Sequence, residues 1–264
     1  MGDRRSSVWV NGSLYGRDSL PPEVAIRFGT SLGISPVCHL REQLLLVRHI
    51  AVLERAAGTL GYVGFDADTV RATIAASDAP ATIVALVPSP ADHKAATPGT
   101  DWTVVTAPFT PPDASTPLRL IVSRHRRNHR SPTANALLLG DAEFRAGTRE
   151  ATAAACDEVV WLQLDDAVSC IGPGVVFAEI AGRVVTPPLA DGVPDSAWRG
   201  ACIDRATVAE ARISLDALRS AIAVACLWPW GSVQAVAQID DVTYADRSLA
   251  PTLTAAITTV AGPT

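Results

Sequence analysis

Short apolar runs separated by turns rich in glycine, proline and aspartate dominate the chain, and they predict a mixed α/β protein. A hairpin is expected at the start, because Asn11-Gly12 is a typical two-residue turn between strand-like segments. Helical spacing of apolar residues follows over Arg41–Leu60. A second helix is expected over Asp68–Ala76, capped by Asp66 or Asp68. The strands expected next are Ala81–Val87, Trp102–Ala107 and Leu118–Ser123.

The second half of the chain shows the same mixed pattern after a segment rich in proline and aspartate, Phe109–Pro117, which predicts a linker. A helix is expected over Asp141–Ala155, before a series of short strands. The remaining expected elements are strands Glu158–Leu164, Phe177–Ile180, Arg183–Thr186, Ile222–Leu227 and Val233–Ile239, with helices Ala197–Ala209 and Leu215–Ala221. We therefore expect two α/β lobes, residues 1–112 and 118–264.

Composition narrows the function classes. The 264 residues are 48% hydrophobic, and their formal net charge is −5, which argues against nucleic acid as a partner. No apolar run approaches the roughly 18 residues of a membrane span. Met1–Ser7 is polar and lacks the apolar stretch of a secretory signal, so we expect a cytoplasmic protein without a membrane partner. Five widely spaced cysteines indicate reduced thiols rather than disulfides or a metal site.

The basic run Arg124–Arg130 is typical of nucleic-acid binding when taken in isolation. It is short, and no aromatic residues interrupt it. We therefore interpret the run as a solvated connecting face, with a wall of an anionic-substrate cleft as the alternative.

Several segments share their order and spacing with one enzyme family. They are Trp9-Val10-Asn11-Gly12, Arg27-Phe28-Gly29, Arg48–Leu53, Arg126-Arg127-Asn128 with Ser131-Pro132, Asp157-Glu158-Val159, and Thr186-Pro187-Pro188 with Arg199. Together they resemble the fold-type IV enzymes that use pyridoxal phosphate (PLP), the class IV aminotransferases and aminodeoxychorismate lyases. This resemblance implies a D-amino-acid aminotransferase-like fold, a homodimer, and a cleft between two lobes that binds a small molecule.

The resemblance also shows where this chain departs from the family. Its Schiff-base lysine falls on Leu137, and the acidic partner of its pyridine nitrogen falls on Cys170. The phosphate-binding arginine falls on Val52, and the two phosphate turns fall on Ser196-Ala197-Trp198 and Trp228–Gly231. Leucine cannot form an aldimine, and a neutral thiol is a poor partner for a pyridinium. We therefore predict that PLP does not bind and that the protein uses no cofactor.

The loop Ser89–Lys94 holds the groups best suited to replace the lost chemistry. It resembles an active-site loop of the D-amino-acid-type relatives, and it contains Lys94, the one lysine of the chain. His93 is a candidate general acid or base, Lys94 could hold a carboxylate, and Asp92 could orient the imidazole. The alternative is an exposed polar loop.

Other candidates lie in the second lobe. Cys170 could act as a nucleophile, or it could be a buried, inert thiol. Arg199 could bind an anion or form a surface ion pair. The remaining substrate-binding candidates are Leu137, Trp198, Trp228 and Trp230. These tryptophans could stack on a conjugated substrate, or they could fill the space that the cofactor left.

The function that follows is a PLP-independent enzyme on the aminotransferase scaffold. It would act by elimination, isomerisation, cyclisation or hydrolysis on a small anionic or conjugated biosynthetic intermediate. One alternative is a non-catalytic relative that binds a ligand or stabilises a partner. A second alternative is a PLP-dependent aminotransferase or lyase, for which Lys94 would have to supply the amine.

Overall fold

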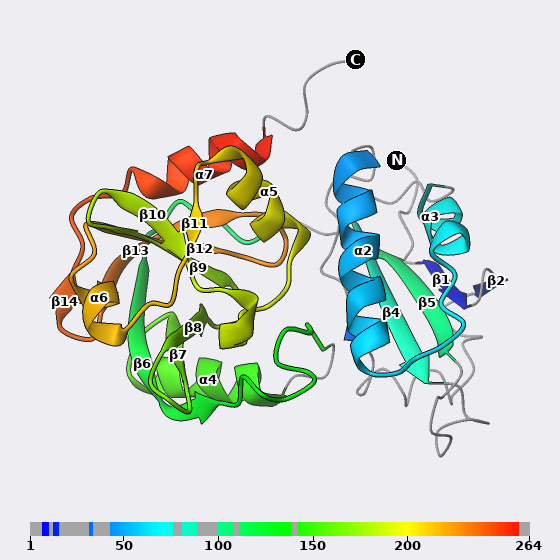
Figure 1. Ribbon diagram of the computed structural model, residues 1–264, viewed down its shortest axis with the longest axis horizontal. Helices are drawn as coiled ribbons and strands as arrows, with labels where there is room; N and C mark the ends of the chain where they lie inside the picture. The colour runs from blue at the N-terminus through cyan, green and yellow to red at the C-terminus, as the bar shows by residue number, and fades with distance from the viewer. Residues whose placement is uncertain are drawn as a thin grey trace. The chain divides into compact units, whose positions relative to one another are not determined.

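The computed structural model describes residues 7–10, 13–15, 32–33, 43–75, 81–88, 100–107, 111–138 and 142–258. Two compact units divide the chain (Figure 1). Unit 1 is Met1–Thr110 with Ala136–Asp141, and unit 2 is Pro111–Asn135 with Ala142–Thr264. None of the helices in these ranges is long and apolar enough to cross a membrane.

Unit 1 contains an antiparallel sheet of five strands in the order β2-β1-β5-β4-β3. Its strands are β1 (Ser7–Val10), β2 (Ser13–Tyr15), β3 (Leu32–Gly33), β4 (Ala81–Pro88) and β5 (Thr100–Ala107). The strands β1 and β2 pair on either side of Asn11-Gly12, as the turn residues predict. Most of the unit's strand backbone therefore follows the pattern expected from local turn and strand signals.

Two helices build the apolar core of unit 1. They are α2 (Gln43–Thr59) and α3 (Ala67–Ala75). Residues of α2 at helical spacing, including Leu46, Ile50 and Leu53, are buried in one cluster with Val70 and Ile74 of α3. The expected cap of α3 is Asp66, whose Oδ1 accepts hydrogen bonds from the backbone N–H groups of residues 68 and 69.

Unit 2 is built on a larger mixed sheet. Eight of its strands follow the order β11-β10-β9-β12-β13-β6-β7-β8, and β14 pairs with β13. The pairs β13–β6, β6–β7 and β10–β11 are parallel, and the others are antiparallel. The strands are β6 (Leu118–Arg127), β7 (Glu158–Gln163), β8 (Val168–Ile171), β9 (Val175–Ile180), β10 (Arg183–Thr186), β11 (Ala209–Glu210), β12 (Ala223–Leu227), β13 (Val233–Ile239) and β14 (Val242–Thr243).

Helices cover this sheet. They are α4 (Ala142–Ala153), the 3-10 turn η4 (Leu189–Asp191), α5 (Ala197–Arg205), α6 (Leu215–Arg219) and α7 (Leu249–Thr258). Helix α4 packs on β6 and β7, and α7 packs on β12 and β13 (Figure 1). All residues of β7, β8 and β12 are buried, which explains why β12 and residues 159–162 of β7 are continuous apolar runs rather than alternating ones.

The structure corrects several expected boundaries. The helix expected to reach Ala209 ends at Arg205, because Thr207 has a φ of 52° and Ala209 belongs to β11. Helix α6 ends at Arg219, two residues earlier than expected. Strands β3, β8, β11 and β14 and helix α7 were not expected from the sequence pattern. Strand β6 continues to Arg127 and so includes half of the basic run, which changes the interpretation of that run.

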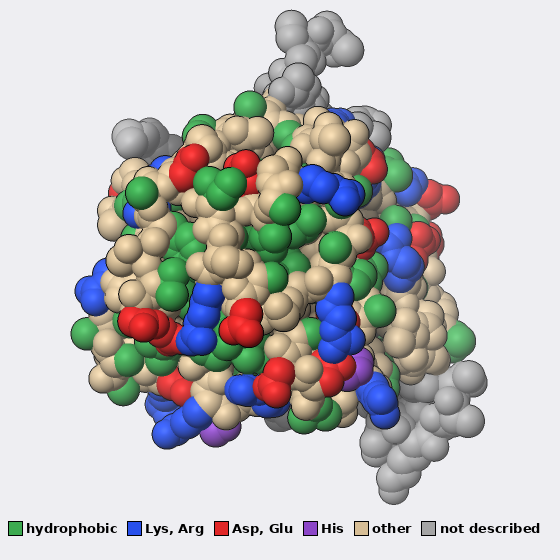
Figure 2. Space-filling view, turned by 60° about the vertical axis from the view of Figure 1, so that its left-hand side comes forward, with side chains coloured by type: hydrophobic (Ala, Val, Ile, Leu, Met, Phe, Trp, Pro, Cys, Tyr) green, Lys and Arg blue, Asp and Glu red, His purple; other side chains and the backbone are tan. Residues whose placement is uncertain are grey.

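Charged side chains of both signs are mixed on the surface. Figure 2 shows Lys and Arg side chains interspersed with Asp and Glu side chains on one face. Together with the net charge of −5, this face lacks the continuous basic field that nucleic-acid binding requires.

Candidate functional site

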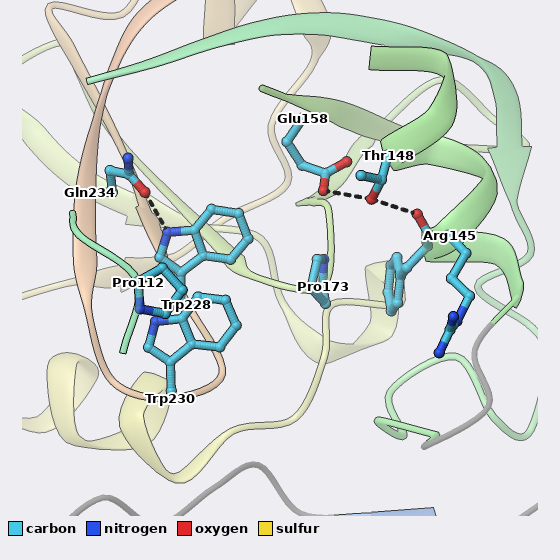
Figure 3. Close-up of a pocket in the computed structure, with 9 residues that line it drawn as sticks. Pro112, Arg145, Thr148, Glu158, Pro173, Trp228, Trp230 and Gln234 are labelled. Atoms are coloured by element: carbon cyan, nitrogen blue, oxygen red, sulfur yellow. Dashed lines mark hydrogen bonds between the residues drawn. The ribbon is translucent and has the colours of Figure 1, made fainter. Parts of the chain in front are cut away.

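A pocket of about 360 Å³ lies in unit 2, which is within the size range of small-molecule sites. Helix α4 forms one side, the β12–β13 turn forms another, and the start of β7 contributes a single carboxyl group (Figure 3). The lining residues are Pro112, Phe144, Arg145, Thr148, Glu158, Pro173, Trp228, Trp230 and Gln234.

Two stacked indoles form one side of the pocket. The rings of Trp228 and Trp230 lie 5.1 Å apart and are almost parallel, at 5°. The turn after β12 positions both rings, because the backbone N–H of Trp228 donates to the Ser232 carbonyl at 2.9 Å. The indole Nε1 of Trp228 donates to Gln234 Oε1 at 2.8 Å (Figure 3). Trp228 is buried, whereas Trp230 is half-buried.

A third tryptophan supports this turn from behind. Gly231 has a φ of 89°, and a Cβ at this position would lie 2.8 Å from the Trp198 ring. Trp198, at the start of α5, is buried and does not line the pocket. Its ring therefore packs on the turn backbone, and only glycine satisfies both the φ angle and the space.

Glu158 is a buried carboxyl group at the first position of β7. Its Oε1 accepts from the Val159 N–H at 3.0 Å, and its Oε2 lies 3.0 Å from Thr148 Oγ1. The Thr148 hydroxyl also lies 3.1 Å from the Phe144 carbonyl, and it has only one hydrogen to donate. When that hydrogen bonds to the carbonyl, the contact with Glu158 requires a proton on the carboxyl group. Burial also raises the pKa of Glu158, which shifts its protonation equilibrium toward the neutral acid.

A stability measurement tests this protonation. The pKa of Glu158 in the folded protein lies above its ordinary value of 4.5. The protonated side chain therefore contributes fully to folding stability below pH 4.5, and this contribution is lost as pH rises through the pKa of the folded state. Glu158→Gln keeps the shape and removes the titration. We expect the wild type to lose stability relative to this variant as pH rises, measured by urea unfolding at a series of pH values. A difference that is independent of pH would contradict the protonated state.

A buried arginine lies behind the pocket. Arg127, at the end of β6, is 5% exposed, and its guanidinium stacks over the Phe144 ring at 4.9 Å. Its Nε donates to Glu143 Oε2 at 3.1 Å. Its two terminal nitrogens donate to the Gly192 carbonyl, the Ala134 carbonyl, Ser169 Oγ and Cys170 Sγ. This side chain therefore connects β6, β8, α4 and the segment before α5.

Sequence reasoning missed Arg127, although it lies in one of the segments that carry the family resemblance. The register of β6 shifts between Val122 and Arg126, and this irregularity breaks the simple alternation of buried and exposed positions. Arg126 instead lies at the surface and pairs with Asp166 at 2.8 Å. The interpretation of the run as a solvated face is therefore wrong for Arg127.

Cys170 lies next to this guanidinium, with 3.2 Å between Sγ and Arg127 Nη1. The side chain is fully buried. Burial raises the pKa of the thiol, while the positive charge of Arg127 acts in the opposite direction. These surroundings favour a neutral thiol over a thiolate nucleophile.

The other residues predicted for the site do not line this pocket. Arg199 is buried on α5, where its Nη2 donates to the Pro187 carbonyl at 2.9 Å and pairs with Glu210 at 2.5 Å. Leu137 is half-buried and belongs to the segment assigned to unit 1. Asp92, His93 and Lys94 lie outside the described residues. The pocket thus brings together Trp228 and Trp230 of the predicted set and adds Glu158, Thr148 and Arg145.

Comparisons with known proteins address the family. No curated protein matches the sequence. Among solved structures, a branched-chain aminotransferase from Thermoproteus uzoniensis has a TM-score of 0.81 at 18% identity, covering 96% of this chain and 94% of that one. A fold IV transaminase from Curtobacterium pusillum has a TM-score of 0.77 at 20% identity, and the match covers 98% of this chain and 100% of that one. A putative 4-amino-4-deoxychorismate lyase from Legionella pneumophila has a TM-score of 0.74 at 17% identity, and the match covers 89% of this chain and 93% of that one.

These likenesses establish the fold, and they confirm the class IV aminotransferase-like α/β architecture expected from the sequence. The family model for amino-transferase class IV matches residues 41–240, which is most of the chain. The chain therefore belongs to the class IV aminotransferase family.

Proposed function

We propose that this protein is a PLP-independent enzyme on the class IV aminotransferase scaffold. It would act by acid–base chemistry, such as elimination, isomerisation, cyclisation or hydrolysis, on a small anionic or conjugated molecule. The contact between Arg127 and Cys170 carries this proposal, because it lies where the family resemblance assigns the partner of the pyridine nitrogen.

The residues at that position do not fit PLP. A protonated pyridine nitrogen needs an acidic acceptor, but Cys170 is a neutral thiol that already accepts a hydrogen bond from the Arg127 guanidinium. A second cation placed there would be repelled. Two like charges about 4 Å apart cost on the order of 4 kcal/mol at an effective dielectric constant near 20.

The assigned phosphate turns do not fit either. Trp198 and Trp228 are buried indoles in place of small hydroxyl side chains. The Trp228 Nε1 already donates to Gln234, so it is not placed to receive a phosphate. A phosphate dianion against these apolar rings would lack the charge-assisted hydrogen bonds that such a group needs.

The third difference from the family is the lack of a lysine amine in the second lobe. The chain has no lysine from residue 111 to its end, and its one lysine is Lys94. We propose His93 as the acid or base, with Asp92 and Lys94 beside it as orienting and anion-holding groups. We further propose that the enzyme is a homodimer, as the family resemblance implies, and that it is cytoplasmic, as its widely spaced cysteines indicate.

A PLP-dependent aminotransferase is the second candidate. Its support is the similarity to a branched-chain aminotransferase over 96% of this chain. It requires an aldimine on Lys94, because the chain offers no other side-chain amine.

A spectroscopic experiment separates the two candidates. After incubation with excess PLP and desalting, we expect the protein to show no visible absorbance band of a PLP–lysine Schiff base, because the second lobe has no amine. A class IV branched-chain aminotransferase treated in the same way is the positive control. A band that survives desalting in the wild type and disappears in Lys94→Ala would establish the second candidate instead.

A further inference from the structure

The pocket in unit 2 contains a buried carboxyl group without a cationic partner. Glu158 lines the pocket, is 6% exposed, and forms no ion pair within the described part of the chain. Its two oxygens have one neutral partner each, the Val159 N–H for Oε1 and the Thr148 hydroxyl for Oε2. Each oxygen therefore keeps a lone pair for a further donor, and the charge of the ionised group is uncompensated until a cation arrives.

We infer that this pocket binds a small organic cation whose charged head is an amidinium or guanidinium group. The two parallel N–H bonds of such a head match the two oxygens of a carboxylate, and Glu158 would accept them side by side. A volume of about 360 Å³ is within the range of small-molecule sites. The inference goes beyond the proposed function, because it assigns a second kind of ligand and does not involve His93.

The hydrogen bonds around Glu158 accommodate the exchange of a proton for a cation. The Thr148 hydroxyl lies 3.0 Å from Glu158 Oε2 and 3.1 Å from the Phe144 carbonyl, and it has one hydrogen to donate. While Glu158 is protonated, Thr148 can donate to the carbonyl. Once the carboxyl group ionises, rotation of the hydroxyl hydrogen directs it to Oε2 instead. The entering cation therefore replaces the Glu158 proton, which passes to the solvent, and each carboxylate oxygen keeps one donor from the protein.

The walls of the pocket strengthen a charge pair at this point. Pro112, Pro173 and Trp228 present apolar surface, and the indole Nε1 of Trp228 is already engaged with Gln234 Oε1 at 2.8 Å (Figure 3). No N–H of these three side chains therefore competes with a ligand for Glu158. Because charges attract more strongly where water is excluded, a cation gains more from this carboxylate than from one at the surface.

The base that shares the pocket is placed where its charge is screened. Arg145 is exposed on α4, and Figure 3 shows its side chain directed away from the Glu158 carboxyl group. Water and salt weaken its repulsion of a ligand, whereas burial strengthens the attraction by Glu158. The remaining repulsion counts against a second positive charge on the ligand, so we expect a monocation.

Titration calorimetry on the full-length protein tests the inference with three probes of similar size. Benzamidine carries a planar two-pronged cation, benzylamine carries a single ammonium nitrogen, and benzamide is the neutral analogue of benzamidine. At about pH 8 we expect benzamidine to bind about tenfold more tightly than benzamide and about threefold more tightly than benzylamine. No binding of benzamidine, or equal binding of benzamidine and benzamide, would overturn the inference. Benzylamine binding as tightly as benzamidine would overturn the assignment of a two-pronged head.

The affinity should also depend on pH in one direction. Burial raises the pKa of Glu158, so lowering the pH through that pKa should weaken benzamidine binding by up to about tenfold per pH unit and leave benzamide binding constant. Arg145 keeps its charge, and burial raises the pKa of the Cys226 thiol on β12 well above its ordinary value, so neither group titrates between about pH 5 and 8. Below the pKa of Glu158, calorimetry in two buffers of different ionisation enthalpy should detect about one released proton. Benzamidine binding that is independent of pH would contradict the exchange.

Variants locate the binding. Glu158→Gln should weaken benzamidine binding about tenfold and abolish its pH dependence, with an unchanged circular dichroism spectrum as the check on folding. Glu179→Gln, on β9 and outside the pocket, should change neither. Arg145→Gln should have the opposite sign and strengthen binding about twofold, whereas Arg149→Gln, one turn along α4 and outside the pocket, should have no effect. Wild-type affinity in folded Glu158→Gln, or weaker binding in Arg145→Gln, would overturn the inference.

Discussion

Replacing Arg127 with methionine should lower the free energy of unfolding by about 3 to 5 kcal/mol, the range for removing one partner of a buried ionic network. Methionine keeps much of the apolar length of the side chain, so the loss is chiefly that of the guanidinium. The carbonyls of Gly192 and Ala134 would each lose a donor at 2.9 and 3.2 Å in a buried environment. Glu143 would lose its cation, although its partial exposure limits this part of the cost.

Urea unfolding monitored by tryptophan fluorescence measures this effect. Arg126→Met is the matched control, because it removes the neighbouring arginine, whose ion pair with Asp166 is largely solvated. We expect that control to cost less than about 1 kcal/mol. Equal losses in the two variants would mean that the Arg127 network does not hold β6, β8 and α4 together.

Gly231→Ala should destabilise the protein by about 3 kcal/mol, which combines left-handed backbone strain with overpacking. Gly231 has a φ of 89°, which is unfavourable for an alanine, and its added Cβ would lie 2.8 Å from atoms of the Trp198 ring. Both the turn and the buried indole would have to shift. The variant should also disturb the stacking of Trp228 on Trp230, which the same turn supports.

Gly182→Ala separates the two contributions. Gly182 has a φ of 73°, but an added Cβ would meet nothing within 4 Å. We expect this control to cost only the backbone term of about 1 kcal/mol, in the same thermal or urea unfolding assay. If the two alanine variants lose equal stability, the contact with Trp198 contributes nothing, and the role assigned to that tryptophan is wrong.

The sequence by itself was sufficient for the family and for most elements of the fold. Helix α2 has apolar residues at helical spacing, and β7 and β12 are apolar runs, so local patterns predict them. Leu137 and Cys170 were assigned by counting along segments whose order matches the family. Such assignments use only the chemical identity of a residue and its spacing along the chain, which are local properties.

Only the tertiary structure decided which polar groups work together. Arg126 and Arg127 are identical residues in one run, yet the β6 irregularity buries one and exposes the other. Glu158 becomes a candidate acid because Thr148 on α4 and the Phe144 carbonyl compete for one hydrogen, and Trp228 is fixed by Gln234 from the next strand. Burial, protonation and hydrogen-bond partners depend on residues distant along the chain or on other elements, so no local pattern contains them.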